Sequence, residues 1–276
     1  MIRRFLCLAA CCALAGSGLL AGEPPLPAGP TASALPHGPY LDPNLRPLME
    51  AVTFRLSFDA NSLRPDMAAG ADYEPRLLKS WVEGIERPRF ADGLFGRALV
   101  LGTGRGQYVS AGTAPLATRG AVALWVRPEN WRRDGGGNVT FFGGGSGLLV
   151  QRQGPGDGKR KRHERLFTHG RADPNNRFGS IGHSVPEYGR WCLIVSNWAW
   201  PEYAMSVNGG ALRMKSLAAT PDADMFRSFV VGSGGGQRAL LDEVLIFRRP
   251  LAPKEIALLW RLRPPAPCVS APASDD

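Results

Sequence analysis

Two adjacent acidic residues, Asp242 and Glu243, are the first candidates for chemistry, because apolar residues flank them on both sides. A retaining glycosidase needs two carboxyl groups about 5 to 5.5 Å apart across the scissile bond. Neighbouring side chains on a strand point to opposite faces, so we expect that these two cannot act together as acid and nucleophile. At least one of the carboxylates should be partly buried, and it must then be paired or coordinated.

An aromatic-rich turn, Asn197–Tyr203, is the clearest candidate for ligand binding. Trp198, Trp200 and Tyr203 would offer flat apolar faces to sugar rings, and the neighbouring amide and carboxylate would bond to hydroxyl groups. The alternative is structural, with Trp198 closing the core at a strand end and Trp200 packing under the loop.

A run of four basic residues in a glycine-flanked segment is the strongest local charge feature: Lys159, Arg160, Lys161 and Arg162. In a protruding loop these side chains would bind an anionic polysaccharide or phosphate, and the alternative is a solvated loop without a partner. The net charge is +9, and subtracting the two arginines of the leader leaves +7. That charge favours anionic partners, although an arginine-rich composition alone also produces it.

The histidines, by contrast, show no pattern of a catalytic or metal site. His37, His163, His169 and His183 are scattered without the spacing of metal ligands or of a triad. We expect His169 and His183 to be surface or turn residues of strands.

Short strands must position all of these residues. From Val52 onward, apolar or alternating runs are separated by glycine-rich turns, which predicts two stacked antiparallel sheets and disfavours a parallel α/β sheet. One short amphipathic helix is predicted to begin at Pro253, with Ile256, Leu259 and Trp260 on one face. The thirteen expected strands are Val52–Phe58, Ala98–Leu101, Gln107–Ser110, Ala121–Val126, Val139–Phe142, Gly147–Gln151, Arg165–His169, Phe178–His183, Trp191–Trp198, Tyr203–Asn208, Ala211–Lys215, Phe229–Gly232 and Leu240–Phe247.

The N-terminal residues 1–22 have the order of an export signal, with two arginines, an apolar run and then small residues. Cys11 is alternatively the lipidated residue of a lipoprotein. Residues 23–48 contain eight prolines, so 23–49 is expected to be an extended linker, followed by a domain over 50–262 and a disordered proline-rich tail over 263–276. No later run reaches membrane-spanning length, so no transmembrane segment is expected in the exported protein.

Two cysteines, Cys192 and Cys268, remain once the signal is removed. In an oxidising compartment they would form one disulfide that holds the tail to the sandwich. The alternative is a buried free Cys192 beside a disordered Cys268, and the sequence leaves both open because it gives no distance.

Three segments, taken in order, resemble LamG-like jelly-roll domains of the concanavalin A-like lectin/glucanase superfamily. This resemblance covers roughly residues 50 to 262. It implies an all-β fold, a two-sheet antiparallel jelly-roll sandwich with one short C-terminal helix. The first segment comprises Leu56–Asn61, Gly93–Leu99, Gln107–Val109 and Gly120–Pro128; the second comprises Gly189–Trp191 and Met205–Gly209; the third comprises Leu241–Phe247 and Arg249–Ala252.

The resemblance also bears on metal binding and hydrolysis. In this family the opening strand and the late strand lie close together, and in some members such acids hold calcium, which makes Asp59, Asn61 and Asp242 candidate ligands. The alternative is a salt bridge or hydrogen bonds to loop amides, since calcium takes about six to eight oxygens. The glucanase arrangement Glu-x-Asp-x-x-Glu does not occur in this sequence, so we do not expect an enzyme.

Together these features predict an exported, non-catalytic module that binds polysaccharide or cell-surface glycoconjugates, anionic ones included. The first alternative is a structural or protein-interaction domain of the cell envelope that contacts surface proteins, and a weaker one is an unrecognised glycoside hydrolase. We expect no nucleic-acid partner, and a location that is secreted, periplasmic or at the cell surface.

Overall fold

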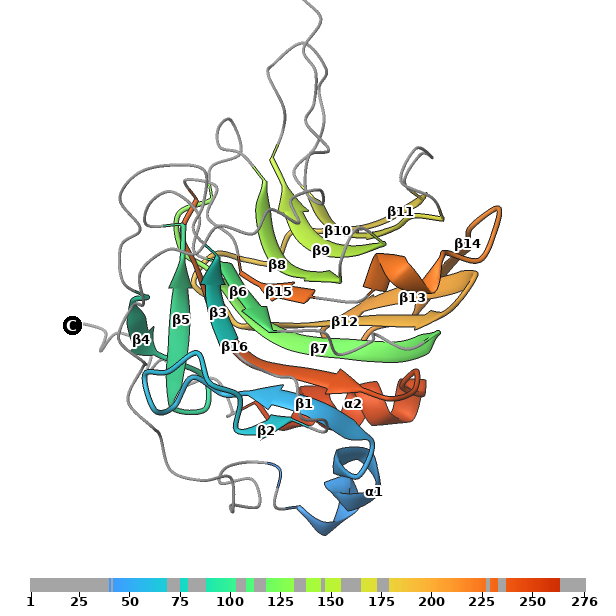
Figure 1. The fold of residues 1–276 in the computed structure, drawn as a ribbon. Helices are drawn as coiled ribbons and strands as arrows, with labels where there is room; N and C mark the ends of the chain where they lie inside the picture. Colours follow the sequence, from blue (N-terminus) through green and yellow to red (C-terminus); the bar gives the residue numbers. More distant parts are fainter. Residues whose placement is uncertain are drawn as a thin grey trace, which may run out of the picture. The chain divides into compact units, whose positions relative to one another are not determined.

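In a computed structural model, two antiparallel sheets contain the strands of the described residues (Figure 1). The structure describes residues 40, 42–68, 75–78, 88–102, 108–111, 118–131, 138–144, 147–154, 165–172, 179–226, 229–232 and 237–263. All of these residues fall in one compact unit, Ala34–Asp276.

Sheet A is built around its long central strands. Its order is β14 (Arg213–Ser216), β13 (Glu202–Val207), β12 (Cys192–Ala199), β7 (Arg119–Pro128), β16 (Ala239–Phe247), β1 (Val52–Leu56) and β2 (Met67–Ala68). One edge of β16 pairs with β7, and the other is shared by two strands. Its first residues pair with β5 (Arg97–Leu101), which pairs in turn with β4 (Phe90–Asp92), whereas its last residues pair with β1.

Sheet B lies across the core from sheet A. Its order is β11 (Gly179–Ser184), β10 (Arg165–Gly170), β9 (Leu148–Gln153), β8 (Val139–Gly144), β15 (Phe229–Val231), β6 (Tyr108–Ala111) and β3 (Pro75–Leu78). Apolar side chains of both sheets form one buried cluster, which we call the interior core. Phe54 of sheet A, for example, meets Phe229 of sheet B edge to face, with ring centroids 5.0 Å apart.

The outer face of sheet A is covered by helices. There α2 (Pro253–Arg261) buries Ile256 and Leu259, and its Trp260 stacks on Trp125 of β7 at 5.6 Å. The Glu255 carboxylate accepts hydrogen bonds from the Ala252 N–H at the helix start and from Arg249. The predicted C-terminal helix is therefore confirmed, and Glu255 stabilises its first turn although Ala252 offers no side-chain cap.

The folded region begins earlier than the expected boundary near Glu50. The helical turns η2 (Pro43–Leu45) and α1 (Arg46–Met49) pack on the outer face of sheet A, and Tyr40, Leu45 and Leu48 are only 3%, 1% and 2% exposed. Two of the prolines that suggested an extended linker, Pro43 and Pro47, lie at the first positions of these turns, where proline is tolerated. We call residues 40 and 42–49 the N-terminal strap.

Cys192 is a free thiol, fully buried in the interior core, where burial raises its pKa to about 12. Of the two alternatives, the structure thus shows a buried free Cys192 and not a disulfide. Cys268 lies outside the described residues. The third short helix, η3 (Ala223–Phe226), precedes β15. Within the part of the chain that the structure describes, no helix is long and apolar enough to cross a membrane.

Candidate functional site

The acidic pair lies at a β-bulge where β16 changes partners. Asp242 pairs with Trp125 of β7, but the next paired residue is Leu245, so one extra residue is inserted. Glu243 adopts a φ of 48°, which breaks the regular alternation of side chains. Leu241 before the pair and Val244 after it both belong to the interior core, so both acids lie on the outer side of sheet A. The prediction that they face opposite ways is wrong, because the bulge interrupts the alternation of side chains. The bulge itself cannot be seen in the sequence.

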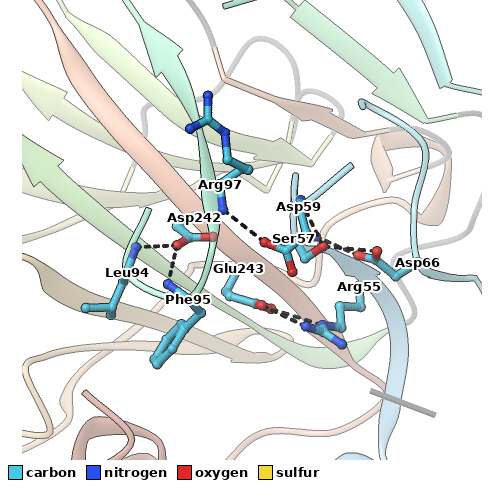
Figure 2. Close-up of polar contacts among 9 residues, drawn as sticks. All are labelled: Arg55, Ser57, Asp59, Asp66, Leu94, Phe95, Arg97, Asp242 and Glu243. Atoms are coloured by element: carbon cyan, nitrogen blue, oxygen red, sulfur yellow. Dashed lines mark hydrogen bonds and ion pairs between the residues drawn. The ribbon is translucent and has the colours of Figure 1, made fainter. Parts of the chain in front are cut away.

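Glu243 forms a buried ion pair with Arg55 of β1 (Figure 2). The Arg55 Nη2 and Nε groups donate to the two carboxylate oxygens at 2.7 and 3.0 Å, and the two residues are 5% and 0% exposed. The ring of Tyr40 in the strap covers the guanidinium, 5.1 Å from its centroid. A bidentate pair of this kind satisfies both charges away from water.

Asp242 is also fully buried but is only half satisfied (Figure 2). Its Oδ2 accepts hydrogen bonds from the Leu94 and Phe95 amides at 2.7 and 3.1 Å, whereas its Oδ1 has no partner among the described residues. Burial and the neighbouring Glu243 carboxylate raise the pKa of Asp242 to about 7, against the opposing effect of the two amides. The close approach of the loop depends on Gly93, because a Cβ there would lie 2.5 Å from Asp242 Oδ2.

The other two predicted calcium ligands, Asp59 and Asn61, accept hydrogen bonds from Arg97. The Asp59 Oδ1 accepts from the Arg97 backbone N–H at 2.9 Å, and the Asn61 amide oxygen accepts from Arg97 Nε at 3.0 Å. Asp59 and Asp242 are near enough for their charges to interact. Two carboxylates are fewer than the oxygens that calcium takes, and no group of three or more His, Cys, Asp or Glu among the described residues is placed to hold a metal.

Calcium binding at Asp59, Asn61 and Asp242 stays a prediction with a direct test. A bound ion would raise the melting midpoint in millimolar calcium and lower it in chelator, because a ligand that binds only the folded state stabilises it. Asp242→Asn should abolish that response. A wild-type midpoint that is the same with calcium and with chelator would remove the metal.

The same burial removes Asp242 and Glu243 from saccharide chemistry. Both side chains are 0% exposed, so a substrate cannot reach either carboxylate. We still expect that these two residues do not cleave a glycosidic bond. The reason is their burial and not, as the sequence suggested, side chains that point to opposite faces of the strand.

The aromatic turn does not form an exposed platform. Trp198 and Tyr203 are each 1% exposed and belong to the interior core. Trp200 is partly buried, and its ring stacks on Phe226 with centroids 5.1 Å apart. The prediction that these rings stack on sugars is wrong for Trp198 and Tyr203, because the loop folds them inward, as the structural alternative held.

The basic residues Lys159, Arg160, Lys161 and Arg162 lie outside the described residues, in the segment between β9 and β10. They therefore remain a prediction.

The outer face of sheet B carries two cross-strand rows of side chains, and no helix of the described residues packs on it. Alternate residues of its strands, such as Val150 and Leu166, point into the interior core, so their neighbours point outward. The first row is Val230, Gly143, Leu149, His169 and Ser180, and the second is Thr140, Gln151, Phe167 and Gly182. We call these nine residues the open face.

A hydrogen-bonded network crosses the open face. Gln151 Nε2 lies 3.0 Å from His169 Nε2, and the other ring nitrogen, Nδ1, lies 2.8 Å from Ser180 Oγ. The Phe167 ring is stacked against the imidazole, with centroids 5.2 Å apart and planes 16° apart. Gln151 and His169 are 6% and 9% exposed, so His169 is not the surface residue that its sequence context suggested. An amide, an imidazole, a hydroxyl and an aromatic ring together resemble the lining of a site for a polar ligand.

This network predicts an acid-sensitive contribution to stability. Burial lowers the pKa of His169 from 6.5 to about 4. The unfolded chain therefore binds more protons between these values, and the free energy of unfolding falls as the pH is lowered from 6.5 to 4, by at most roughly 3 kcal/mol from this residue. Urea unfolding at pH 7 and pH 4.5 should show a smaller loss for His169→Gln than for the wild type. Equal losses in the two proteins would contradict the assignment.

Sequence reasoning missed the open face because its residues are ordinary in strands. The signal that could have found it is the outward set of two neighbouring strands, Gln151 in one and Phe167 with His169 in the other. These residues are polar or aromatic on one side, while the alternate residues Leu148, Val150 and Leu166 are apolar.

The fold and its two unlike faces define a two-layer β-sandwich of the jelly-roll type. A family model described as the concanavalin A-like lectin/glucanases superfamily matches residues 102–257, which is more than half of the chain. The chain belongs to this superfamily, and the resemblance drawn from the sequence is confirmed. No curated protein sequence matches the chain.

Several solved structures of similar fold are binding domains. The botulinum neurotoxin serotype D binding domain is 13% identical with a TM-score of 0.55, and the match covers 77% of this chain and 52% of that one. The binding domain of Paraclostridial Mosquitocidal Protein 1 is 15% identical with a TM-score of 0.58, over 77% and 52%. A botulinum neurotoxin DC binding domain in complex with SialylT is 13% identical with a TM-score of 0.57, over 78% and 52%. The chain thus spans about half of these structures, and at such identities the likeness shows the fold alone.

Proposed function

We propose that this protein is an exported, non-catalytic binding module that holds carbohydrate on the open face of sheet B. The observation that carries the proposal is the network of Gln151, His169 and Ser180 beside the Phe167 ring, on a sheet face where no helix of the described residues packs. Amide, imidazole and hydroxyl groups bond to sugar hydroxyls, and an aromatic ring packs on the apolar face of a pyranose.

Three further observations support it. The superfamily includes lectins, the similar structures are binding domains, and residues 1–22 have the order of an export signal. In this proposal the protein acts outside the cytoplasm, secreted, periplasmic or at the cell surface.

A glycan array tests the proposal. The labelled wild-type protein should bind a defined set of saccharides, and Phe167→Ala should weaken that binding roughly tenfold, the equivalent of about 1.4 kcal/mol. Tyr188→Ala is the matched control, since Tyr188 is 46% exposed and lies outside the two rows. Failure to bind any glycan, or equal losses in both variants, would contradict the proposal.

The basic segment is proposed to add an electrostatic contribution for acidic glycans. Replacing Lys159, Arg160, Lys161 and Arg162 by serine should lower the salt concentration that elutes the protein from an anionic glycan column, because fewer charge pairs then oppose elution. An unchanged elution position would leave that segment without a role in binding.

A further inference from the structure

The nine residues of the open face contain no carboxylate, ammonium or guanidinium group. Their polar side chains are a threonine, a glutamine, a histidine and a serine, and the others are glycine or apolar. Three described cations lie beside these nine residues. The first row continues from Val230 through Ser110 of β6 to Arg76 of β3. Arg165 is the next outward residue of β10, and Arg213 of β14 donates to the Gly182 carbonyl at 2.7 Å. Among the described residues, the nine positions of the open face are thus polar or apolar but uncharged.

The network on this face has a fixed direction. The Gln151 amide nitrogen can only donate, so His169 Nε2 must accept its hydrogen bond. A neutral imidazole that accepts at Nε2 carries its proton on Nδ1, which donates to Ser180 Oγ at 2.8 Å. The Ser180 hydroxyl is then turned to donate its own proton away from the ring. The low pKa of His169, about 4, keeps the ring neutral at physiological pH.

The direction of the network also separates binding from catalysis. A serine is activated as a nucleophile when a ring nitrogen accepts its proton. Here the nitrogen beside Ser180 already carries a proton and donates it, so His169 cannot deprotonate Ser180 in this arrangement. The same three residue types therefore act as a donor chain toward a ligand.

We infer that the relay Gln151–His169–Ser180 makes the open face selective for an uncharged sugar ring, one of whose oxygens accepts a hydrogen bond from the Ser180 hydroxyl. The inference rests on the proposed function and specifies its ligand class. Ser180 is partly exposed at the end of its row, so the proton that it donates is accessible, while Phe167 supplies the apolar contact to the ring.

Gln151→Glu tests the relay because it keeps the shape and reverses the polarity. A carboxylate can only accept, so His169 would have to place its proton on Nε2, and Nδ1 would then accept from Ser180. The hydroxyl could then no longer donate its proton to the ligand. Gln153→Glu is the matched control, since Gln153 is the next outward residue of β9 and gains the same charge two positions from the relay.

Two measurements carry the test. Long-range proton–nitrogen spectra of the imidazole should show the Nδ1–H form of His169 in the wild type and the Nε2–H form in Gln151→Glu. Titration with the best neutral oligosaccharide from the array should show binding that is tenfold weaker or more in Gln151→Glu and Ser180→Ala but changes less than twofold in Gln153→Glu. Wild-type binding should be the same at 50 and 500 mM salt, because no charge is engaged.

The outcomes separate the two claims. Binding only to acidic glycans, weakened by salt and unaffected by Gln151→Glu, would overturn the inference and leave the proposed function standing. An Nε2–H imidazole in the wild type would also overturn the inference. A protein that binds no saccharide on the array would remove the proposed function, and the inference with it.

Discussion

Replacing Arg55 by methionine is expected to destabilise the fold by about 3 to 5 kcal/mol, the loss typical of a buried ion pair deprived of one partner. The change would leave the Glu243 carboxylate, which is 0% exposed, without its counter-charge and beside Asp242. Glu243→Gln should cost a similar amount by stranding the Arg55 guanidinium. Urea unfolding at pH 7 measures both losses.

The double variant Arg55→Met, Glu243→Gln is expected to recover much of the loss, because no unpaired charge of this pair then remains buried. Arg190 and Glu187 provide the matched control. Their contact is just as short, 2.8 Å, but their side chains are 77% and 73% exposed, so Arg190→Met should cost less than about 0.5 kcal/mol. Additive losses in the double variant, or equal losses at the buried and exposed pairs, would show that burial of the charge is not what matters.

Removing the N-terminal strap should have the second large effect. A chain that begins at Ala51 lacks Tyr40, Leu45 and Leu48, and it exposes apolar side chains of the outer face of sheet A to water. We expect a loss of a few kcal/mol, seen as a fall of roughly 5 to 10 °C in the melting midpoint. The uncovered face should also bind a hydrophobic dye.

A chain that begins at Ala34 is the control for this truncation, because it keeps the whole strap and should melt close to the full-length protein. Leu48→Ala in the full-length chain is the second control, with an expected loss of about 2 to 5 kcal/mol as for other buried leucines. If the chain from Ala51 melted with the wild type, the folded region would begin at the boundary first predicted.

Much of the sandwich could be predicted because strand alternation is a local property. Each of the thirteen expected strands overlaps an observed one, and the C-terminal helix begins at Pro253 as expected. Three observed strands were missed: β2, β3 and β4, of two, four and three residues. Such short runs show little of a period, although β15, of three residues, was predicted. The strap was missed because its two proline-led turns resemble an extended linker in composition.

The sites were harder to predict because they depend on contacts between distant segments. The sequence showed that Asp242 and Glu243 needed partners but gave no sign of the bulge, since glutamate is an unusual residue at positive φ. The tryptophans of the turn looked like binding residues, and only the packed loop shows Trp198 buried. Gln151, His169 and Ser180 come from three strands, and only the register brings them into contact.

The strap and the open face lie on opposite sides of the sandwich. Tyr40, the first described residue, packs on the outer face of sheet A, while the side chains of the open face project from the far side of sheet B. A tether attached ahead of Tyr40 thus reaches the module from its helix-covered back. A molecule held in this way would display its recognition surface toward the surroundings, so immobilisation through the N-terminus should preserve access for large polymers.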